Sequence, residues 1–199
     1  SYDASEGFGL RAVKGEVAGY AHSTEISEAA LTRATETARL AVGDGGGTLA
    51  LPPKGTNLRL YSDADPMLDA SFAGKIDLLR EIDAYTRALD PRVVQVSATL
   101  SAGLQEVEIL RPEGLRLADV RPMARINISV IVEQDGRRES GGMGGGGRHG
   151  LARLMEPAHW QGVAREALRV ALVNLDAVPA PAGVMDVVLK PFSAAQMIA

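Results

Sequence analysis

The sequence contains no cysteine, so its 199 residues can form no disulfide bond and supply no thiolate metal ligand. Aromatic residues make up only 4% of the chain, and no apolar run is long enough to span a bilayer as a helix. The net charge of −4 gives no electrostatic reason to bind nucleic acid or an anionic membrane. The opening SYDASEGFG is polar, unlike a signal peptide. We therefore expect a cytoplasmic protein that binds neither nucleic acid directly nor a membrane.

The stretch from Asp119 to Gly150 organises the rest of the chain. Its first part alternates apolar and polar residues, and the apolar ones fall at Ala124, Ile126, Ile128, Val130 and Val132. This period of two predicts a long strand with one buried face. Asp135-Gly136 follows, and this pair favours the tight turn of a β-hairpin because glycine adopts positive φ without strain. The return strand is predicted over Arg137 to Ser140.

Glycine occupies six of the seven positions from Gly141 to Gly147. Because glycine loses more conformational entropy on folding than any other residue, a folded chain that keeps such a run usually needs bare backbone there. Two interpretations remain open. The run is a flexible surface loop, as glycine-rich segments often are, or its bare backbone allows close approach of another chain or unusual φ and ψ.

The rest of the chain contains short strands and longer helices. Strands are predicted at residues 9–12, 17–21, 93–100, 105–110 and 115–120, and another at 184–189. Helices are predicted at 27–42, at 71–89 and from Pro157 onward, where proline suits the first helical turn. From residue 93 to the glycine run, about five strands follow one another through short turns, which favours an antiparallel sheet.

Each helix carries an apolar face at helical spacing. In the first helix this face consists of Leu31, Ala34, Ala38, Ala41 and Val42. In the second it consists of Phe72, Ile76, Leu79, Ile82 or Asp83, and Leu89. In the third it consists of Trp160, Val163, Ala164, Ala167, Leu168, Ala171, Leu172 and Leu175. We expect this third helix to cover the inner face of the sheet.

These elements predict an α+β fold, in which an antiparallel sheet packed with helices follows a small, partial N-terminal α/β subdomain. The glycine-rich residues 43–47 end the first helix, and the segment at 48–57, which contains Pro52-Pro53, is typical of a linker. We therefore expect one domain over residues 1–50, a second over 56–180, and the start of a further domain over 184–199.

The sequence shows no self-contained catalytic or metal site. His22, His149 and His159 lack the i, i+4 spacing of a helical zinc site. Asp63 and Asp65 lack the glycine and glutamate of a calcium loop, so capping and turn formation explain them better. The glycine run lacks the Gly-Lys-Ser/Thr ending of a phosphate-binding loop and follows an antiparallel hairpin. We predict no catalytic residue, metal ligand or cofactor in this chain.

Several stretches together resemble the TldD/PmbA family, and specifically its TldD side. They run through most of the chain in the family's order: Gly7 to Val13, Gly19 to Ala21, Asp119 to Val132, Asp135 to Arg138, Gly144 to Arg148, Ala171 to Leu175 and Ala180 to Gly183. This family was first described as modulators of DNA gyrase and is now understood as metallopeptidases. The resemblance implies a zinc-dependent peptidase that cleaves unfolded or extended peptides. It also implies a PmbA-like (TldE) partner subunit or a homodimer.

The alternative that the resemblance leaves open is a non-catalytic PmbA/TldE-like subunit, or a module that interacts with gyrase. In the family the zinc ligands lie on a helical HExxxH motif just beyond the strand that corresponds to residues 184–189, with a cysteine further on. Neither is present, and residues 190–199 (KPFSAAQMIA) depart from the family's turn into that helix. We expect zinc in the intact family member, and no zinc binding or peptidase activity from the 199-residue chain alone.

The glycine run is the candidate substrate site. A peptidase that accepts varied unfolded substrates needs a contact that ignores side chains, and backbone pairing to an exposed strand provides one. We predict that Gly144, Gly145, Gly146 and Gly147 contact the peptide backbone, and that Arg148 binds a carboxylate of the substrate or of the protein itself. The alternative is that these glycines only permit a tight turn beside the third helix.

Overall fold

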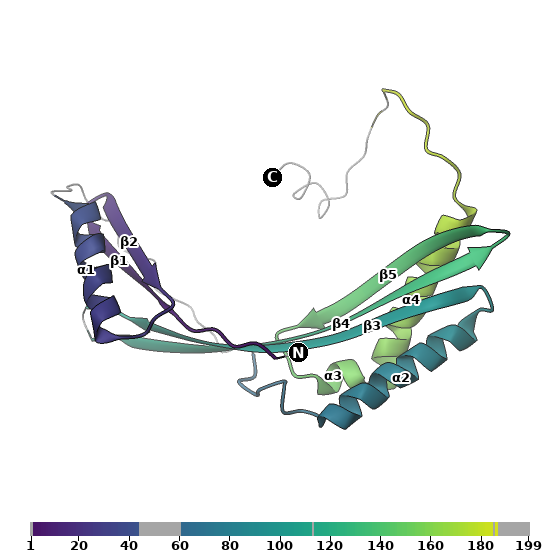
Figure 1. Cartoon of the computed structure of the whole chain (residues 1–199), viewed down its shortest axis with the longest axis horizontal. Coiled ribbons are helices and arrows are strands. Elements are labelled where there is room, and N and C mark those ends of the chain that lie inside the picture. Colours follow the sequence, from purple (N-terminus) through teal and green to yellow (C-terminus); the bar gives the residue numbers. More distant parts are fainter. Residues whose placement is uncertain (1, 44–60, 113, 185, 187–199) are drawn as a thin grey trace. The chain divides into compact units, whose positions relative to one another are not determined.

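The computed structural model describes residues 2–43, 61–112, 114–184 and 186. These residues belong to two compact units, Ser1–Leu58 and Arg59–Ala199. Each unit contains an antiparallel sheet packed against helices, and the first is a small hairpin with one helix (Figure 1). The α+β prediction is therefore confirmed. Most of the strand expected at 184–189 lies outside the described residues.

The first unit consists of strands β1 (Phe8–Lys14) and β2 (Val17–Ser23) and helix α1 (Glu28–Val42). The strands pair antiparallel, and the helix packs on one face of the hairpin. The Ser27 side chain caps the helix by accepting a hydrogen bond of 3.1 Å from the Ala30 amide. Glycine is required at Gly19, because a Cβ there would lie 2.3 Å from the Ala38 carbonyl oxygen.

The apolar face expected for α1 is wrong at Leu31 and at Ala41, which are both exposed. Leu31 is 42% exposed, whereas Ala30 is buried together with Ala34, Ala38 and Val42. The face that contacts the hairpin is therefore centred on alanines. Their small side chains bring the helix backbone close to the sheet, and the larger Leu31 lies at the margin of that contact.

The sheet of the second unit has three long strands in the order β3-β4-β5, with β3 at Val93–Leu110, β4 at Arg116–Gln134 and β5 at Arg137–Gly147. The prediction of an antiparallel sheet is confirmed, but that of about five strands is wrong. Gly103 pairs with Met123 and Leu104 pairs with Pro122, so both β3 and β4 continue where the sequence pattern breaks. Backbone pairing needs no regular side-chain pattern, and the ladder therefore extends through this irregular stretch.

The hairpin that joins β4 to β5 turns at Asp135-Gly136, as predicted. Both residues have positive φ, 52° and 79°, which is the conformation of a type I′ turn. Beyond it, the residues from Gly141 to Gly147 pair with Val130 back to Ala124 without a register shift. The interpretation of this run as a flexible loop is therefore wrong, and so is the tight turn, because these glycines continue an extended strand.

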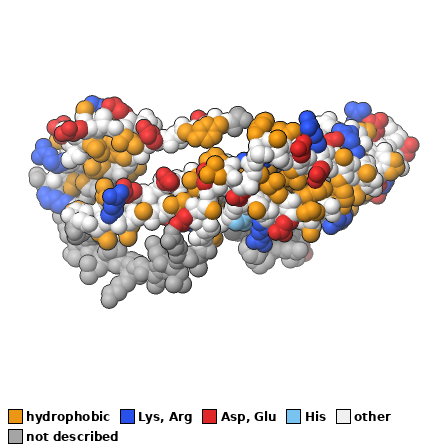
Figure 2. Space-filling view, turned by 90° about the horizontal axis from the view of Figure 1, so that it is seen from below, with side chains coloured by type: hydrophobic (Ala, Val, Ile, Leu, Met, Phe, Trp, Pro, Cys, Tyr) orange, Lys and Arg blue, Asp and Glu red, His pale blue; other side chains and the backbone are white. Residues whose placement is uncertain are grey.

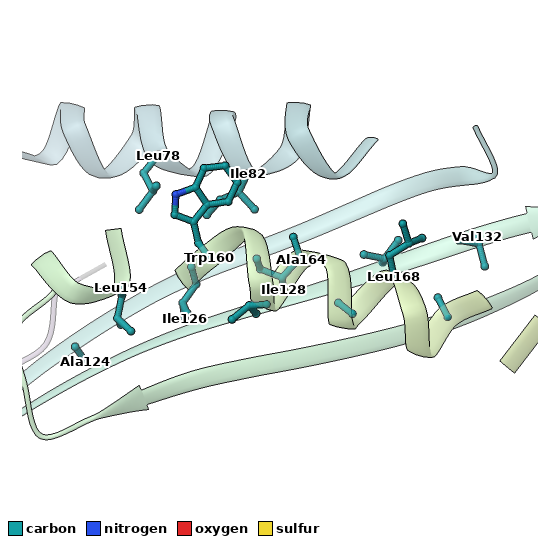
Figure 3. Packing of buried hydrophobic residues seen from close by; sticks show 14 of the residues in the cluster. Leu78, Ile82, Ala124, Ile126, Ile128, Val132, Leu154, Trp160, Ala164 and Leu168 are labelled. Atoms are coloured by element: carbon teal, nitrogen blue, oxygen red, sulfur yellow. The ribbon is translucent and has the colours of Figure 1, made fainter. Parts of the chain in front are cut away.

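Three helices accompany this sheet: α2 (Phe72–Leu89), the short α3 (Ala152–Met155) and α4 (Pro157–Asp176). Helix α4 packs on β4 and β5, and α2 packs on β3 and α4. Trp160 of α4 points toward Leu78 and Ile82 of α2, and its ring meets that of Tyr85 edge to face at 5.3 Å (Figure 3). The short α3 was not predicted.

The core confirms the predicted inner face of β4 and the predicted face of α4. The buried residues from these two elements are Ala124, Ile126, Ile128, Val130, Val132, Trp160, Val163, Ala164, Ala167, Leu168, Ala171 and Leu175. The predicted face of α2 is wrong at its start, because Phe72 is 79% exposed and the buried positions are Leu78, Ile82 and Thr86. The Thr86 hydroxyl donates to the Ile82 carbonyl, so this polar side chain is satisfied within the core.

Gly141 is where β5 comes closest to α4. A Cβ on this residue would lie 2.2 Å from the Ala171 amide nitrogen and 2.3 Å from the Ala167 carbonyl oxygen. Both atoms belong to the helix backbone, which cannot move away without repacking the core. By contrast, the nearest atom to a Cβ on Gly142 would be 3.7 Å away.

We therefore expect Gly141→Ala to reduce the free energy of unfolding by roughly 1–3 kcal/mol, the usual cost of an overpacked core. Gly142→Ala is the matched control, and we expect it to leave stability unchanged or slightly raised, because alanine restricts the unfolded chain. Urea unfolding of both variants measures the difference. Equal stabilities for the two variants would contradict this account of the contact between α4 and β5.

Candidate functional site

Strand β5 forms one edge of the described sheet, and its alternate residues face away from β4. The Asn174 side chain donates a hydrogen bond of 2.9 Å to the Ser140 carbonyl, so the Ser140 backbone points outward. Glu133 of β4 pairs in register with Arg138 of β5. Its amide points away from β5 and donates a hydrogen bond to the Arg92 carbonyl oxygen, in the loop before β3. Both observations give the same alternation. Along an antiparallel strand, the backbone N–H and C=O groups of every second residue point to the same side. Gly142, Gly144 and Gly146 therefore direct these groups away from β4, as Ser140 does.

On the sheet face opposite the helices, these three glycines of β5 contribute no side chains. Gly142 and Gly144, together with small polar residues of β3 and β4, line a shallow hollow of about 430 Å³, to which Ser97, Thr99, Asn127 and Ser129 contribute polar side chains. No charged side chain lines this hollow. The lining of the hollow is therefore polar, and a cation lies beside it: Arg125 Nε donates a hydrogen bond of 2.9 Å to Asn127 Oδ1, and Arg125 Nη2 would lie 3.0 Å from a Cβ on Gly144.

The bare backbone of β5 has a local reason at most of its positions. A Cβ on Gly144 would lie 2.3 Å from Asn127 Oδ1, and one on Gly146 would lie 2.3 Å from the Ala124 carbonyl oxygen. Gly145 and Gly147 each face a histidine. A Cβ on Gly145 would lie 3.3 Å from His159 Nε2, and one on Gly147 would lie 3.1 Å from His149 Cδ2. The glycines therefore permit close approach of atoms of this chain. Gly142 is the exception, because its surroundings have room for a side chain.

Arg148 follows the last glycine and binds residues near the start of β4. Its Nη2 lies 3.2 Å from the Val120 carbonyl oxygen and 3.5 Å from Asp119 Oδ1, and its guanidinium lies 4.3 Å from the ring centroid of Tyr61. The predicted carboxylate partner is thus present within the protein. Arg121 binds the same carboxylate at 2.6 Å, and Arg121 first and Arg148 second hold the pKa of Asp119 below its ordinary value.

The histidines do not assemble into a metal site in the part of the chain that the structure describes. His149 Nδ1 lies 2.8 Å from the Gly150 carbonyl, and His159 Nε2 is buried with no hydrogen-bond partner among the described residues. No group of three His, Cys, Asp or Glu side chains there is arranged to hold a metal ion. Asp65, near the considered calcium site, accepts a hydrogen bond from the Met67 amide, as expected of a turn. The described residues therefore do not fit a resident zinc ion.

Charges of both signs are interspersed on the face of the molecule shown in Figure 2. This distribution lacks the continuous basic stripe that phosphate backbones require. Among the described residues, no helix combines the length and apolar character needed to cross a bilayer.

The chain matches two models of one family over most of its length. The central domain of the PmbA/TldA metallopeptidases matches residues 65–175, and domain 1 of the same metallopeptidases matches residues 1–42. Among curated relatives, the metalloprotease TldD homolog of Haemophilus influenzae is 40% identical over 197 residues, and that of Buchnera aphidicola from Acyrthosiphon pisum is 33% identical over 199 residues. These alignments include 95% of this chain but 41% of each relative, so the chain spans about two fifths of their length.

A solved structure from Bacteroides thetaiotaomicron, described as that of a candidate modulator of DNA gyrase, has the same fold. The TM-score is 0.65 at 16% sequence identity, and the match covers 85% of this chain and 40% of that one. At this identity the similarity supports the fold alone.

The two arginines at Asp119 allow a direct test of the geometry around Arg148. We expect Arg121→Gln to raise the pKa of Asp119 toward its ordinary value more than Arg148→Gln does, because the hydrogen bond from Arg121 is the largest cause of the lowering. Since folding lowers this pKa, the contribution of Asp119 to stability is present above about pH 4 and is lost as the pH falls through the folded value. Titration of the Asp119 carboxyl carbon by NMR measures both variants. A larger effect from Arg148→Gln would contradict the assignment.

Proposed function

Because the chain belongs to the PmbA/TldD metallopeptidase family and comprises its first and central domains, we propose that it holds extended peptide substrates for a zinc centre located elsewhere in the enzyme. In this proposal the intact enzyme degrades or matures unfolded peptides in the cytoplasm. Its partner is a PmbA/TldE-like subunit or a second copy of itself. The described residues act on the peptide, and none of them contacts nucleic acid directly.

The edge of β5, along which no described strand pairs, is the observation that carries this proposal. Gly142, Gly144 and Gly146 direct backbone donors and acceptors away from the sheet, where an extended peptide can pair with them as an added strand. Each such hydrogen bond contributes about 0.5–1.5 kcal/mol net. Since the contacts are made by backbone groups on both sides, the binding depends on the peptide being extended and little on its sequence.

The residues around this edge give it the rigidity that such binding needs. Gly141 packs directly on the backbone of α4, and Arg148 fixes the end of the strand to Val120 and Asp119. An edge that is already extended loses little conformational entropy when the peptide binds. Arg148 is engaged within the protein, which favours a role in holding the strand over the predicted contact with a substrate carboxylate.

In this proposal the zinc ion is held by residues other than those that the structure describes. A catalytic zinc polarises the scissile carbonyl and lowers the pKa of its bound water. The described residues supply no ligand set for it. In this proposal the chain's own contribution is to bind the peptide backbone and to orient it.

We expect the 199-residue chain alone to bind no zinc and cleave no peptide. A polypeptide that carries these residues and continues to the full length of the relatives is expected to bind zinc and to cleave unfolded peptides, alone or with its partner subunit. Metal analysis and cleavage of an unfolded peptide, with and without a chelator, measure both. A full-length protein that binds no zinc and is inactive until a TldD-like subunit is added would favour the alternative, a non-catalytic partner.

Gly142→Pro in that full-length protein tests the edge itself. Proline removes the outward N–H of residue 142, and it leaves the pairing with β4 intact because that N–H does not face β4. We expect the affinity for an unfolded peptide to fall about two- to tenfold, which corresponds to one lost hydrogen bond. Fluorescence anisotropy with a labelled peptide, after removal of the metal by a chelator, measures the affinity without cleavage.

Gly142→Ala is the matched control, because it adds a methyl group but keeps the N–H. We expect it to bind peptide as the unsubstituted protein does. Urea unfolding of both variants checks that the sheet is retained. Equal peptide affinities for Gly142→Pro and Gly142→Ala, at equal stability, would show that the edge of β5 does not bind the peptide backbone.

A further inference from the structure

Asn174 lies where the free edge of β5 begins. It belongs to the last turn of α4, and its side-chain amide reaches the edge of the sheet to donate a hydrogen bond of 2.9 Å to the Ser140 carbonyl oxygen. That oxygen is the outward acceptor immediately before Gly142 in the same row. Asn174 therefore occupies a position that an added strand would otherwise use.

The same end of β5 is closed by a second group of contacts. Arg137 Nη2 donates to the carbonyl oxygens of Asn174 and Ala177, at 3.0 Å and 3.1 Å, and so holds the end of α4 against the start of the strand. Arg137 also forms an ion pair with Glu139. The helix end and its Asn174 side chain are thereby fixed beside Ser140.

On the other side of Asn174, the residues of β5 whose backbone groups face outward have no side chains, although Arg125 Nη2 of β4 would lie 3.0 Å from a Cβ on Gly144. The outward residues are Gly142, Gly144 and Gly146, and after Gly147 the chain turns toward Arg148, whose side chain binds Val120. An added strand that pairs with these three residues spans the five positions 142–146. Two side chains thus bound the free edge, Asn174 at its start and Arg148 just after its end.

We propose that Asn174 is a specificity-determining residue that limits backbone pairing on β5 to about five peptide residues. By occupying the Ser140 carbonyl, its amide prevents a bound peptide from continuing its pairing past Gly142. The inference rests on the proposed function, since it concerns the register and length of the peptide held at that edge. It assigns to α4 a role beyond packing, because one side chain of this helix sets where the binding edge starts.

The test is a length series of peptides on the full-length protein with its metal removed. Acetylated and amidated peptides of alternating alanine and threonine, three to nine residues long, have little side-chain preference and are compared by their affinities. For the unsubstituted protein we expect the affinity to rise with length and to level off at about five residues. For Asn174→Ala, which frees the Ser140 carbonyl, we expect it to level off at about seven residues, with a gain of about two- to tenfold for the longer peptides.

Val173→Ala is the matched control, because Val173 precedes Asn174 on α4 and is 54% exposed. We expect the length dependence of this variant to equal that of the unsubstituted protein. Asn174→Ser is a second variant, in case alanine weakens the end of the helix, and its shorter side chain should also free the Ser140 carbonyl.

The outcomes separate this inference from the proposed function. If the unsubstituted protein binds peptides with a limit of about five residues and neither Asn174 variant shifts that limit, the inference is wrong and the binding edge stands. If the affinity of the unsubstituted protein increases steadily with peptide length, the proposed limit of about five residues is also refuted. If no peptide of any length binds the unsubstituted protein, the proposed function fails, and the inference fails with it.

Discussion

Strand β4 pairs with a neighbour along both edges, and the positions of the other elements of the second unit depend on this pairing. The side chains from Ala124 to Val132 alternate, so one face of the sheet is apolar and must be covered, while the other carries small polar groups. Helices α2 and α4 cover the apolar face. Because α4 lies against β5 at the distance that only Gly141 permits, the helix end reaches the strand edge, and Asn174 can bind Ser140.

The elements with a regular side-chain pattern were those that the sequence predicted well. Alternation in β4, the Asp135-Gly136 turn and the apolar face of α4 each reflect one local rule, and each is present in the structure. The continuity of β3 and β4 was missed, because Gly103 and Pro122 interrupt the pattern without interrupting the backbone pairing. The sequence alone also did not decide whether Gly141 to Gly147 forms a strand or a loop. Glycines have no side chain, so this run cannot show the alternation of apolar and polar residues that predicts a strand.

The candidate site shows the same division between local and long-range information. The sequence pointed to the glycine run and to a carboxylate partner for Arg148, but it gave no indication that this partner would be Asp119, 29 positions earlier in the chain. Asn174 lies in a stretch that carries the family resemblance, but the sequence gave it no role, because its contact with Ser140 follows from where α4 ends beside β5. Close approach accounts for Gly141, Gly144 and Gly146 within the protein itself, whereas Gly142 has room for a side chain and depends on no such contact.

The central claim is that the outward backbone groups of Gly142, Gly144 and Gly146 pair with an extended peptide. Hydrogen exchange of the β5 amides, followed by NMR in the metal-free protein with and without an unfolded peptide, tests it most directly. We predict that the peptide slows exchange at Gly142, Gly144 and Gly146, and leaves Met143 and Gly145 little changed because their amides already face β4. No change at the three outward amides when the peptide is bound would contradict the account.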